Sequence, residues 1–237
     1  MSKAPWHLRN IRRLVYFGVG VALVGIAISA VLDSPDAAKA WIAARQLYGL
    51  WALVLLLASM LPGPLIFVFP WFPFKAHLIL GRRAIGISSF VMAAAHVTCY
   101  LGPIASSGAW RNLYTPGNLW VCGLVIGLAA LAALAVLALT SRRKSIRSLG
   151  PGNWKRLHKM VYLLLPAALL HASFVGTDFG INKGPDVAGE VDAGCLVAMV
   201  LISLAWVILF WLRKHHVRWA PSFLKRNQHR EASRNPA

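Results

Sequence analysis

Two histidines, His158 and His171, lie thirteen residues apart in the apolar stretch 157–175, and a third, His96, lies inside another apolar stretch. An ionisable side chain at membrane depth is costly, so each of these histidines is a candidate for a functional site. Along one continuous helix, thirteen residues would separate His158 from His171 by about 20 Å and by about 140° of rotation. This spacing predicts two sites at different depths of a bilayer about 30 Å thick, as in a transmembrane haem relay. The competing interpretation is that the histidines bind backbone or water inside a bundle.

The elements that must position these histidines are long apolar segments. The chain has 237 residues, of which 58% are hydrophobic and 14% are charged, whereas soluble domains have about 25% charged residues. Apolar runs of about the length that crosses a bilayer as a helix lie at 14–32, 47–68, 84–101, 119–140, 157–175 and 193–212. The sequence therefore predicts an all-α integral membrane protein, a bundle of six transmembrane helices over residues 14–212. A basic arm (1–13) precedes the bundle, and a basic tail (213–237) follows it.

The positive charges are distributed unevenly between the two sides of such a bundle. Of the 25 lysines and arginines, 21 fall in the arms and in the connections that would share their side. The other side has only Lys39, Arg45, Arg111 and Lys183. Positive charge marks the cytoplasmic face, so both termini are predicted to be cytoplasmic. The net charge of +18 then reflects membrane topology and contact with the lipid bilayer, and no nucleic-acid partner is expected.

Local signals divide the segments further. The sequence Leu61-Pro62-Gly63-Pro64 is expected to break the second helix, and Gly102-Pro103 is expected to end the third. Residues 141–155 are expected to form a basic loop before the fifth helix. The fourth segment is rich in Gly, Ala and Leu, and its small residues favour close helix packing.

The positions of His96 and His171 suggest a shared site. Both segments run from inside to outside, and His96 lies about 18 Å along its helix whereas His171 lies about 21 Å along its own. Similar depth is what two axial ligands of one haem need in order to meet across a bundle core. Ligation by two imidazoles fills both axial positions of the iron and so favours electron transfer over oxygen binding.

His158 lies at the inner end of its segment, and its partner is left open by the sequence. Arg82, fourteen residues before His96, lies at the matching depth, where it could meet a haem propionate or occupy the site opposite His158. His77 is the other candidate partner, although it also fits an ordinary interfacial histidine. None of the six apolar segments contains an acidic residue, which disfavours a carboxylate proton relay and a zinc or non-haem iron site.

Two stretches of the chain resemble the ferric-reductase-like transmembrane domain family. The first is Gly81-Arg82-Arg83-Ala84-Ile85-Gly86, followed by His96 and Tyr100. The second comprises Leu149-Gly150, Trp154, Leu157-His158, Val161-Tyr162 and then His171. The resemblance covers about residues 40–212. Within the family it is strongest to the haem-binding membrane subunits of methionine sulfoxide reductase systems, because Arg82 and Arg83 stand at the inner level where oxidases and ferric reductases have a second histidine.

The resemblance implies a function and a set of roles. His96 and His171 would bind the iron of an outer haem b, and His158, with Arg82, would serve an inner haem site, giving one or two haems. FMN is a further cofactor that the resemblance allows. The chain would be the electron-transfer subunit of an oxidoreductase system in the bacterial inner membrane, rather than a complete enzyme. It would carry electrons from a cytosolic flavin reductase to a periplasmic molybdopterin methionine sulfoxide reductase.

Two other functions are open at this point. One is a transmembrane component of a ferric or other metal reductase, which would use the same haem chemistry with a different acceptor. The other is a membrane transport or assembly protein whose histidines bind no haem. The visible spectrum of the purified protein distinguishes the second alternative from both cytochromes.

Overall fold

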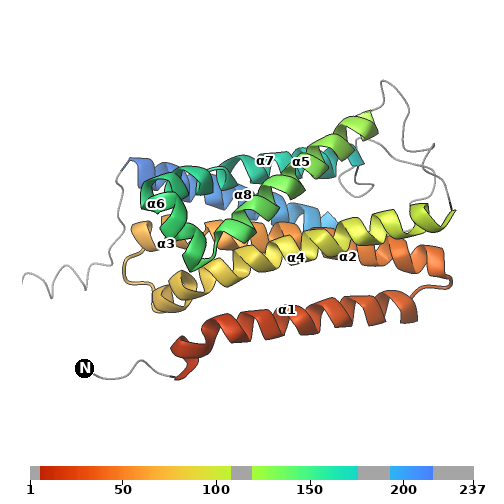
Figure 1. Ribbon diagram of the computed structural model, residues 1–237, viewed down its shortest axis with the longest axis horizontal. Helices are drawn as coiled ribbons and strands as arrows, with labels where there is room; N and C mark the ends of the chain where they lie inside the picture. Colours follow the sequence, from red (N-terminus) through yellow and green to blue (C-terminus); the bar gives the residue numbers. More distant parts are fainter. Residues whose placement is uncertain (1–5, 108–118, 176–192, 216–237) are drawn as a thin grey trace, which may run out of the picture.

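The computed structural model describes residues 6–107, 119–175 and 193–215, and the regular elements in these ranges are α helices. Their bounds are α1 Trp6–Leu32, α2 Ala37–Met60, α3 Pro62–Val68, α4 Lys75–Ser107, α5 Leu119–Thr140, α6 Arg143–His158, α7 Val161–Val175 and α8 Ala193–Lys214. The long helices run roughly along one direction, and α6 turns across one end of them (Figure 1). Helix α1 packs against α2 and α4 at one edge, and α5 pairs with α7 on the opposite side of α4.

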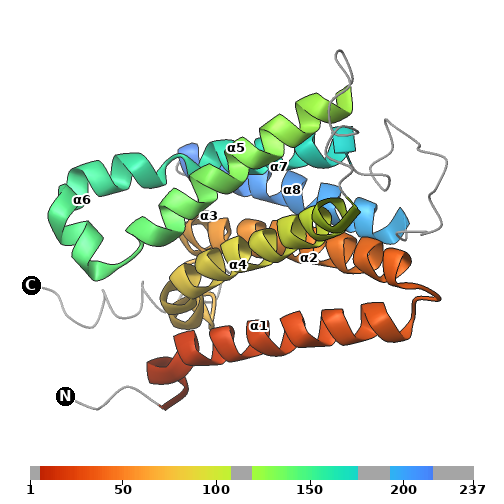
Figure 2. The ribbon, with the colours of Figure 1, turned by 45° about the vertical axis from the view of Figure 1, so that its right-hand side comes forward.

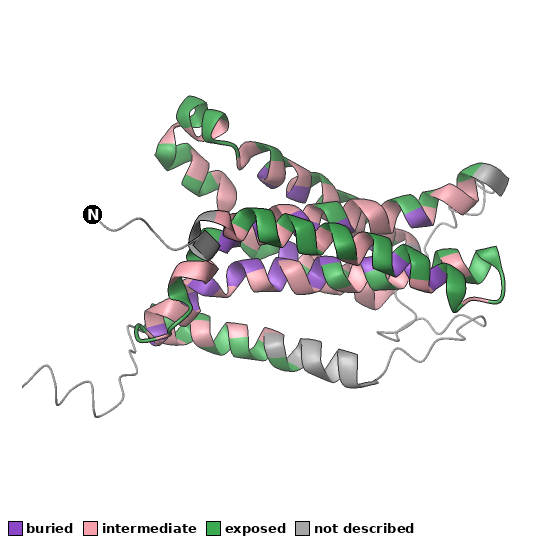
Figure 3. Ribbon diagram, turned by 90° about the horizontal axis from the view of Figure 1, so that it is seen from below, coloured by how far each residue is buried: buried purple, intermediate pink, exposed green. Residues whose placement is uncertain are grey.

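The helix surfaces are apolar where they face outward. Among the described residues, α1, α2 with α3, α4 and α5 each give a segment long and apolar enough to cross a membrane, and α6 with α7 adds a fifth if the bent pair is one span. Large hydrophobic side chains are exposed along these helices, including those of Phe17 (73%) and Leu163 (70%). Figure 3 shows long exposed stretches, in green, on the outward-facing sides of the helices. An outer surface of this kind is stable in lipid, so the chain is a multi-pass membrane protein.

The interior consists of two apolar clusters that share α2. One cluster joins α2 to α5 and α7 through Leu53, Leu134 and Leu164. The other joins α2 to α1 and α4 through residues that include Tyr48 and Met92, and the Tyr48 hydroxyl donates a hydrogen bond to the Leu23 carbonyl of α1 (2.8 Å). Helix α2 is therefore the central support of the helices that carry His96 and His171.

Prolines and polar caps explain where the second and third apolar segments begin and end. The Asp36 carboxylate accepts the Lys39 backbone N–H (2.8 Å) and begins α2. Helix α2 ends at Met60 and α3 begins at Pro62. The predicted break is confirmed only as a one-residue interruption, because Leu61 keeps helical φ and ψ (−60°, −40°) and Ala37–Val68 forms one span. The predicted end at Gly102-Pro103 is wrong, because α4 continues through Pro103 to Ser107. The helix also begins earlier than the apolar run, at Lys75. The apolar run marked only the middle of a longer helix, and a proline so near the helix end removes only one backbone hydrogen bond.

The segment before His171 differs from the prediction in a way that matters for the site. The expected loop at 141–155 is mostly helical, in α6, with a break at Gly150, whose φ of 75° is a conformation that glycine adopts without strain. Helices α6 and α7 are bent by 43°, and the turn between them is tightened by bonds such as Met160 N–H to the Leu157 carbonyl (3.0 Å). His158 and His171 therefore do not share one continuous helix, and the predicted axial and angular offsets between them are wrong.

The two ends of the bundle have different compositions. The beginning of α1, the end of α8 and the whole of α6 lie at the same end, as Figures 1 and 2 both show. Helix α6 has no buried residue. Exposed basic side chains on and beside it are those of Arg142, Arg143, Lys144, Arg147, Lys155, Arg156 and Lys159. This end of the bundle, called the basic end below, is the one near His158.

Candidate functional site

His96 of α4 and His171 of α7 face each other inside the bundle. Their ring centroids are 6.0 Å apart, and the two ring planes are nearly perpendicular, at 89°. Both side chains are partly buried. The structure thus brings together two histidines that are 75 positions apart in the sequence and lie on two different helices.

Each ring is held through its Nδ1 atom by a backbone carbonyl of a neighbouring helix. His96 Nδ1 lies 2.8 Å from the Arg45 carbonyl of α2, and His171 Nδ1 lies 2.7 Å from the Gly123 carbonyl of α5. A carbonyl oxygen only accepts, so Nδ1 carries the proton in both rings, and in a neutral imidazole the lone pair is then on Nε2. A bond of this kind fixes the tautomer and orientation of a metal-binding histidine.

The pair has the donor set and spacing of two axial ligands. Each bond from a metal to an imidazole nitrogen is about 2 Å long, so two rings on opposite sides of one ion have nitrogens about 4 Å apart and centroids somewhat farther apart. The observed centroid separation of 6.0 Å fits this requirement. Within the described ranges, no three His, Cys, Asp or Glu side chains gather as a metal site. Two imidazoles alone suit an iron whose other four ligands come from a porphyrin, so the residues present fit a haem.

A regular set of side-chain bonds fixes α4 against α2. His96, Ser89 and Arg82 follow one another at intervals of seven along α4. In that order, toward the start of α4, they donate to α2 carbonyls that advance by seven residues each time, those of Arg45 (2.8 Å), Ala52 (2.7 Å) and Ser59 (2.8 Å). Two antiparallel helices with this heptad register present one face to each other throughout. The position of His96 therefore depends on the register of the whole α2–α4 pair.

His158 lies in a different environment, at the junction of α6 and α7. Its ring lies against that of Trp154, one helical turn earlier, with centroids 4.1 Å apart and the two planes tilted by 32°. The Thr140 hydroxyl donates to the Val136 carbonyl (2.7 Å), and His158 Nε2 lies 3.3 Å from the same hydroxyl oxygen. Because that hydroxyl proton is already used, Nε2 of His158 is the donor in this contact. Trp154 Nε1 donates to the Thr140 carbonyl (3.1 Å), so Thr140 holds both rings.

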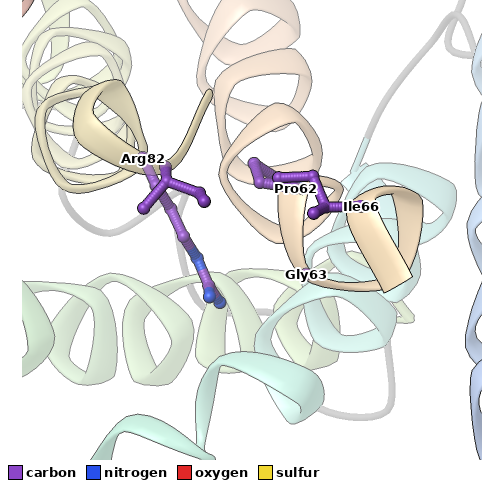
Figure 4. Close-up of a pocket in the computed structure, with 5 residues that line it drawn as sticks. Pro62, Gly63, Ile66 and Arg82 are labelled. Carbon is purple, nitrogen blue, oxygen red and sulfur yellow. The ribbon is translucent and has the colours of Figure 1, made fainter. Parts of the chain in front are cut away.

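Arg82 lies at the level of His158 rather than at that of His96. Fourteen residues of α4 separate Arg82 from His96, which is about 21 Å of helix. The positive charges of Arg82 and Arg83 act electrostatically on His158. Arg82 is exposed, and its Nε donates to the Ser59 carbonyl (2.8 Å). Figure 4 shows its side chain along one side of a small hollow of about 160 Å³, with Pro62 and Ile66 on the other.

The other inner candidate, His77, lies near the start of α4. Its ring packs edge-on against Phe74, with centroids 6.0 Å apart. The contact belongs to the aromatic segment that connects α3 to α4. An aromatic neighbour is also what the alternative prediction, an ordinary interfacial histidine, expects, and the role of His77 opposite His158 stays a prediction.

Sequence reasoning missed the residues that hold the three rings in place. These are the carbonyl acceptors on α2 and α5, and the two residues beside His158, Thr140 and Trp154. Backbone carbonyls leave no signature in residue types, so the bonds to Arg45 and Gly123 could be found only from coordinates. The spacing of Trp154 and His158 by four did carry a signal, because side chains four apart share one face of a helix.

The fold and the facing histidines define a helical membrane protein with a two-imidazole site in its core. The model of the ferric reductase like transmembrane component family matches residues 48–169, just over half of the chain. The chain belongs to that family. The matched region contains His96 and His158 and ends two residues before His171.

Curated relatives are similar over about half of the chain. One from Agrobacterium fabrum, named protein-methionine-sulfoxide reductase heme-binding subunit MsrQ, is 41% identical over 131 residues, 54% of this chain and 55% of its own length. Proteins of the same name from Rhodospirillum rubrum (33%, covering 52% of this chain and 54% of their own) and Brucella ovis (34%, covering 54% of each) are also similar. The chain therefore spans about half the length of the curated relatives it matches.

Proposed function

We propose that this protein is a haem-binding electron-transfer subunit of a membrane methionine sulfoxide reductase system, with His96 and His171 as the axial ligands of one haem b. The observation that carries the proposal is the facing pair of imidazoles, each with its Nδ1 proton bonded to a carbonyl of a different helix. The name of the relatives, protein-methionine-sulfoxide reductase heme-binding subunit, supports the same assignment.

The residues around such a haem would favour electron transfer. A haem b bound here supplies a centre that takes up and passes on one electron. His96 and His171 would be the two protein ligands of its iron, and ligation by two imidazoles favours electron transfer over oxygen binding. Their bonds to the Arg45 and Gly123 carbonyls keep the rings in one orientation, which limits the rearrangement that a change of charge at the iron requires.

Electrons would enter at the basic end and leave on the opposite side of the membrane. The exposed lysines and arginines on and beside α6 offer a docking surface for an acidic face of a cytosolic flavin reductase. His158 and Arg82 lie near this surface and would serve an inner haem or, as a further cofactor, FMN. The acceptor would be a periplasmic molybdopterin methionine sulfoxide reductase, which returns oxidised methionine to its reduced form.

Electron flow from the cytoplasm to the periplasm requires a bundle of six spans with both termini in the cytoplasm of a bacterial cell. The 21-to-4 division of the 25 basic residues supports it, as does the common position of the beginning of α1 and the end of α8. A reporter fused after Ala237 should then be cytoplasmic, and one inserted near Gly184 should be periplasmic. The reverse pattern would contradict the direction of electron flow.

The visible spectrum of the detergent-purified protein tests the proposal. We expect Soret and α bands that sharpen and shift on addition of dithionite, with about one or two haems per chain. A colourless protein that is monodisperse and does not bind added haemin would instead support transport or assembly. If haem is present, electron delivery to a ferric chelate can be compared with delivery to the methionine sulfoxide reductase, and preference for the chelate would favour a metal reductase.

A further inference from the structure

His96 and His171 are held by the same local arrangement on two different helices. His96 donates to the carbonyl of Arg45, and the residue four positions later in α2 is Gly49. His171 donates to the carbonyl of Gly123, and the residue four positions later in α5 is Gly127. In each case a glycine lies one helical turn after the carbonyl that accepts the imidazole proton.

Helix geometry explains why the residue at this position matters. In an α helix the carbonyl of residue i already accepts the N–H of residue i+4, so a second donor must approach it from the side. The Cα–Cβ bond of residue i+4 tilts back toward the N-terminus of the helix, over that same carbonyl. A side chain at i+4 therefore covers the open side of the carbonyl, and glycine leaves it accessible.

The imidazole rings occupy the space that a side chain would take. A Cβ atom on Gly49 would lie 2.8 Å from His96 Nδ1 and 3.0 Å from Cε1. A Cβ atom on Gly127 would lie 2.6 Å from His171 Cε1 and 3.0 Å from Cγ, with Nδ1 as its nearest neighbour. Non-bonded carbon atoms are most stable about 3.5–4.0 Å apart. A single methyl group at either position would therefore displace the ring.

Among the glycines of the described residues, Gly49 and Gly127 are the two at which a Cβ would meet an imidazole ring. A Cβ on Gly123 would instead meet Phe174 Cβ (2.8 Å) in the α5–α7 contact, so close helix packing also uses glycine. Ser89 donates to the carbonyl of Ala52 (2.7 Å), and the residue four positions later is Leu56, because a slender hydroxyl reaches the carbonyl without that space. On α4 itself, a Cβ at Gly86 would make an ordinary 3.7 Å contact with Ser59. A Cβ at Gly25 in α1 would have no neighbour within 4 Å.

We propose that Gly49 and Gly127 are positioning residues for the two axial ligands. They leave the carbonyl oxygens of Arg45 and Gly123 accessible from the side, so that each imidazole lies against its neighbouring helix and donates its Nδ1 proton to that oxygen. This inference rests on the proposed haem function, since it concerns the ligands of that haem. A bond from Nδ1 makes the imidazole a stronger electron donor to a metal. The two glycines therefore lower the reduction potential of the site, as well as keeping both ligands on the iron.

The test is substitution of each glycine by alanine in the full-length, haem-loaded protein. Gly127→Ala and Gly49→Ala are compared with Gly86→Ala and Gly25→Ala as matched controls. Alanine is a better helix former than glycine. If Gly49 and Gly127 served only the helices that contain them, their alanine variants would have the thermal stability and haem spectra of the two control variants. We expect instead a loss of low-spin absorbance, an upward shift of the midpoint potential, and at least a several-fold gain in the fraction that binds carbon monoxide when reduced.

The outcomes separate this inference from the proposed function. A wild-type protein without haem would overturn the proposed function. A wild-type protein with low-spin haem, together with Gly49→Ala and Gly127→Ala spectra and potentials equal to those of Gly86→Ala, would overturn the inference alone. If Gly127→Ala does not fold, Gly49→Ala decides, because its nearest contacts are longer. If Gly49→Ala and Gly86→Ala change the haem spectrum and the midpoint potential by the same amount, the inference is also overturned.

Discussion

The pair His96 and His171, which the proposed topology makes the outer site, and the region around His158 at the basic end, which it makes the inner one, hold their imidazoles in opposite ways. Each outer ring donates through Nδ1 to a backbone carbonyl, at 2.8 and 2.7 Å. The inner ring directs Nε2 to a threonine hydroxyl at 3.3 Å and lies against Trp154. The outer arrangement leaves Nε2 for a metal, whereas the inner one uses Nε2 for a weak hydrogen bond.

The difference concerns how firmly each ring is fixed. A helix carbonyl cannot move without the helix, and α4 is held in register against α2 by three side-chain bonds seven residues apart. The Thr140 hydroxyl can rotate, and His158 lies at a 43° bend between two helices. We therefore expect the outer site to have a fixed coordination, and the inner site to adjust when a partner or cofactor binds.

The largest effect on the inner region is expected from His158→Ala. Loss of the ring should slow reduction of the protein by a flavin reductase about tenfold, equivalent to about 1.4 kcal/mol of activation free energy, while the spectrum of the outer haem stays unchanged. Stopped-flow reduction with the enzymatic donor measures this, and His215→Ala, an exposed histidine on the same end, serves as the control. Wild-type rates would mean that electrons enter elsewhere, and a loss of outer haem absorbance would mean that the two regions are one site.

A smaller effect on the same step is expected from Arg82→Ala. Removal of an exposed charge that acts on His158 should slow enzymatic reduction about threefold, the size typical of a surface charge interaction, and raised salt should reduce the difference. Arg147→Ala, an exposed arginine of α6, is the matched control for net charge. Equal slowing in both variants would show that Arg82 contributes only to the general positive potential.

The smallest effect is expected from Thr140→Val, which removes the hydroxyl but keeps the shape. The unfolding free energy should fall by about 0.5 kcal/mol, because the lost contact to His158 is long and the hydrogen bond to Val136 is local. Thermal unfolding of the purified protein measures this, and Thr98→Val, whose hydroxyl also bonds a carbonyl of its own helix (Ala94, 2.9 Å), is the comparison. If the unfolding free energy instead falls by as much as it does when a buried hydrogen-bond network is broken, His158 is firmly held by Thr140.

Much of this organisation could be predicted from the sequence, for identifiable reasons. Apolar runs with no acidic residue mark membrane helices because burial in lipid depends on composition, and the break before Pro62 follows from the ring of proline. Similar depth for His96 and His171 could be inferred from residue counting along two helices of the same direction, which assumes only a constant rise per residue.

Other features could not be obtained in this way. The helix of residues 143–158 is basic and contains Gly150 and Pro151, which composition assigns to a loop, whereas a positive φ at Gly150 lets two helical pieces join. The bend after His158 likewise has no proline at the break itself. The roles of Gly49 and Gly127 depend on which carbonyl each imidazole meets, and that is a property of helix register and not of residue type.

The central claim is that His96 and His171 bind one haem between them, and haem content in three variants tests it most directly. His96→Ala, His171→Ala and the double variant should each lose the same low-spin absorbance and the same amount of bound haem, because either loss leaves only one axial ligand. Circular dichroism should show that all three keep their helical content. Each single variant losing a different half of the haem, with the double variant losing all of it, would place the two histidines on separate haems and contradict the account.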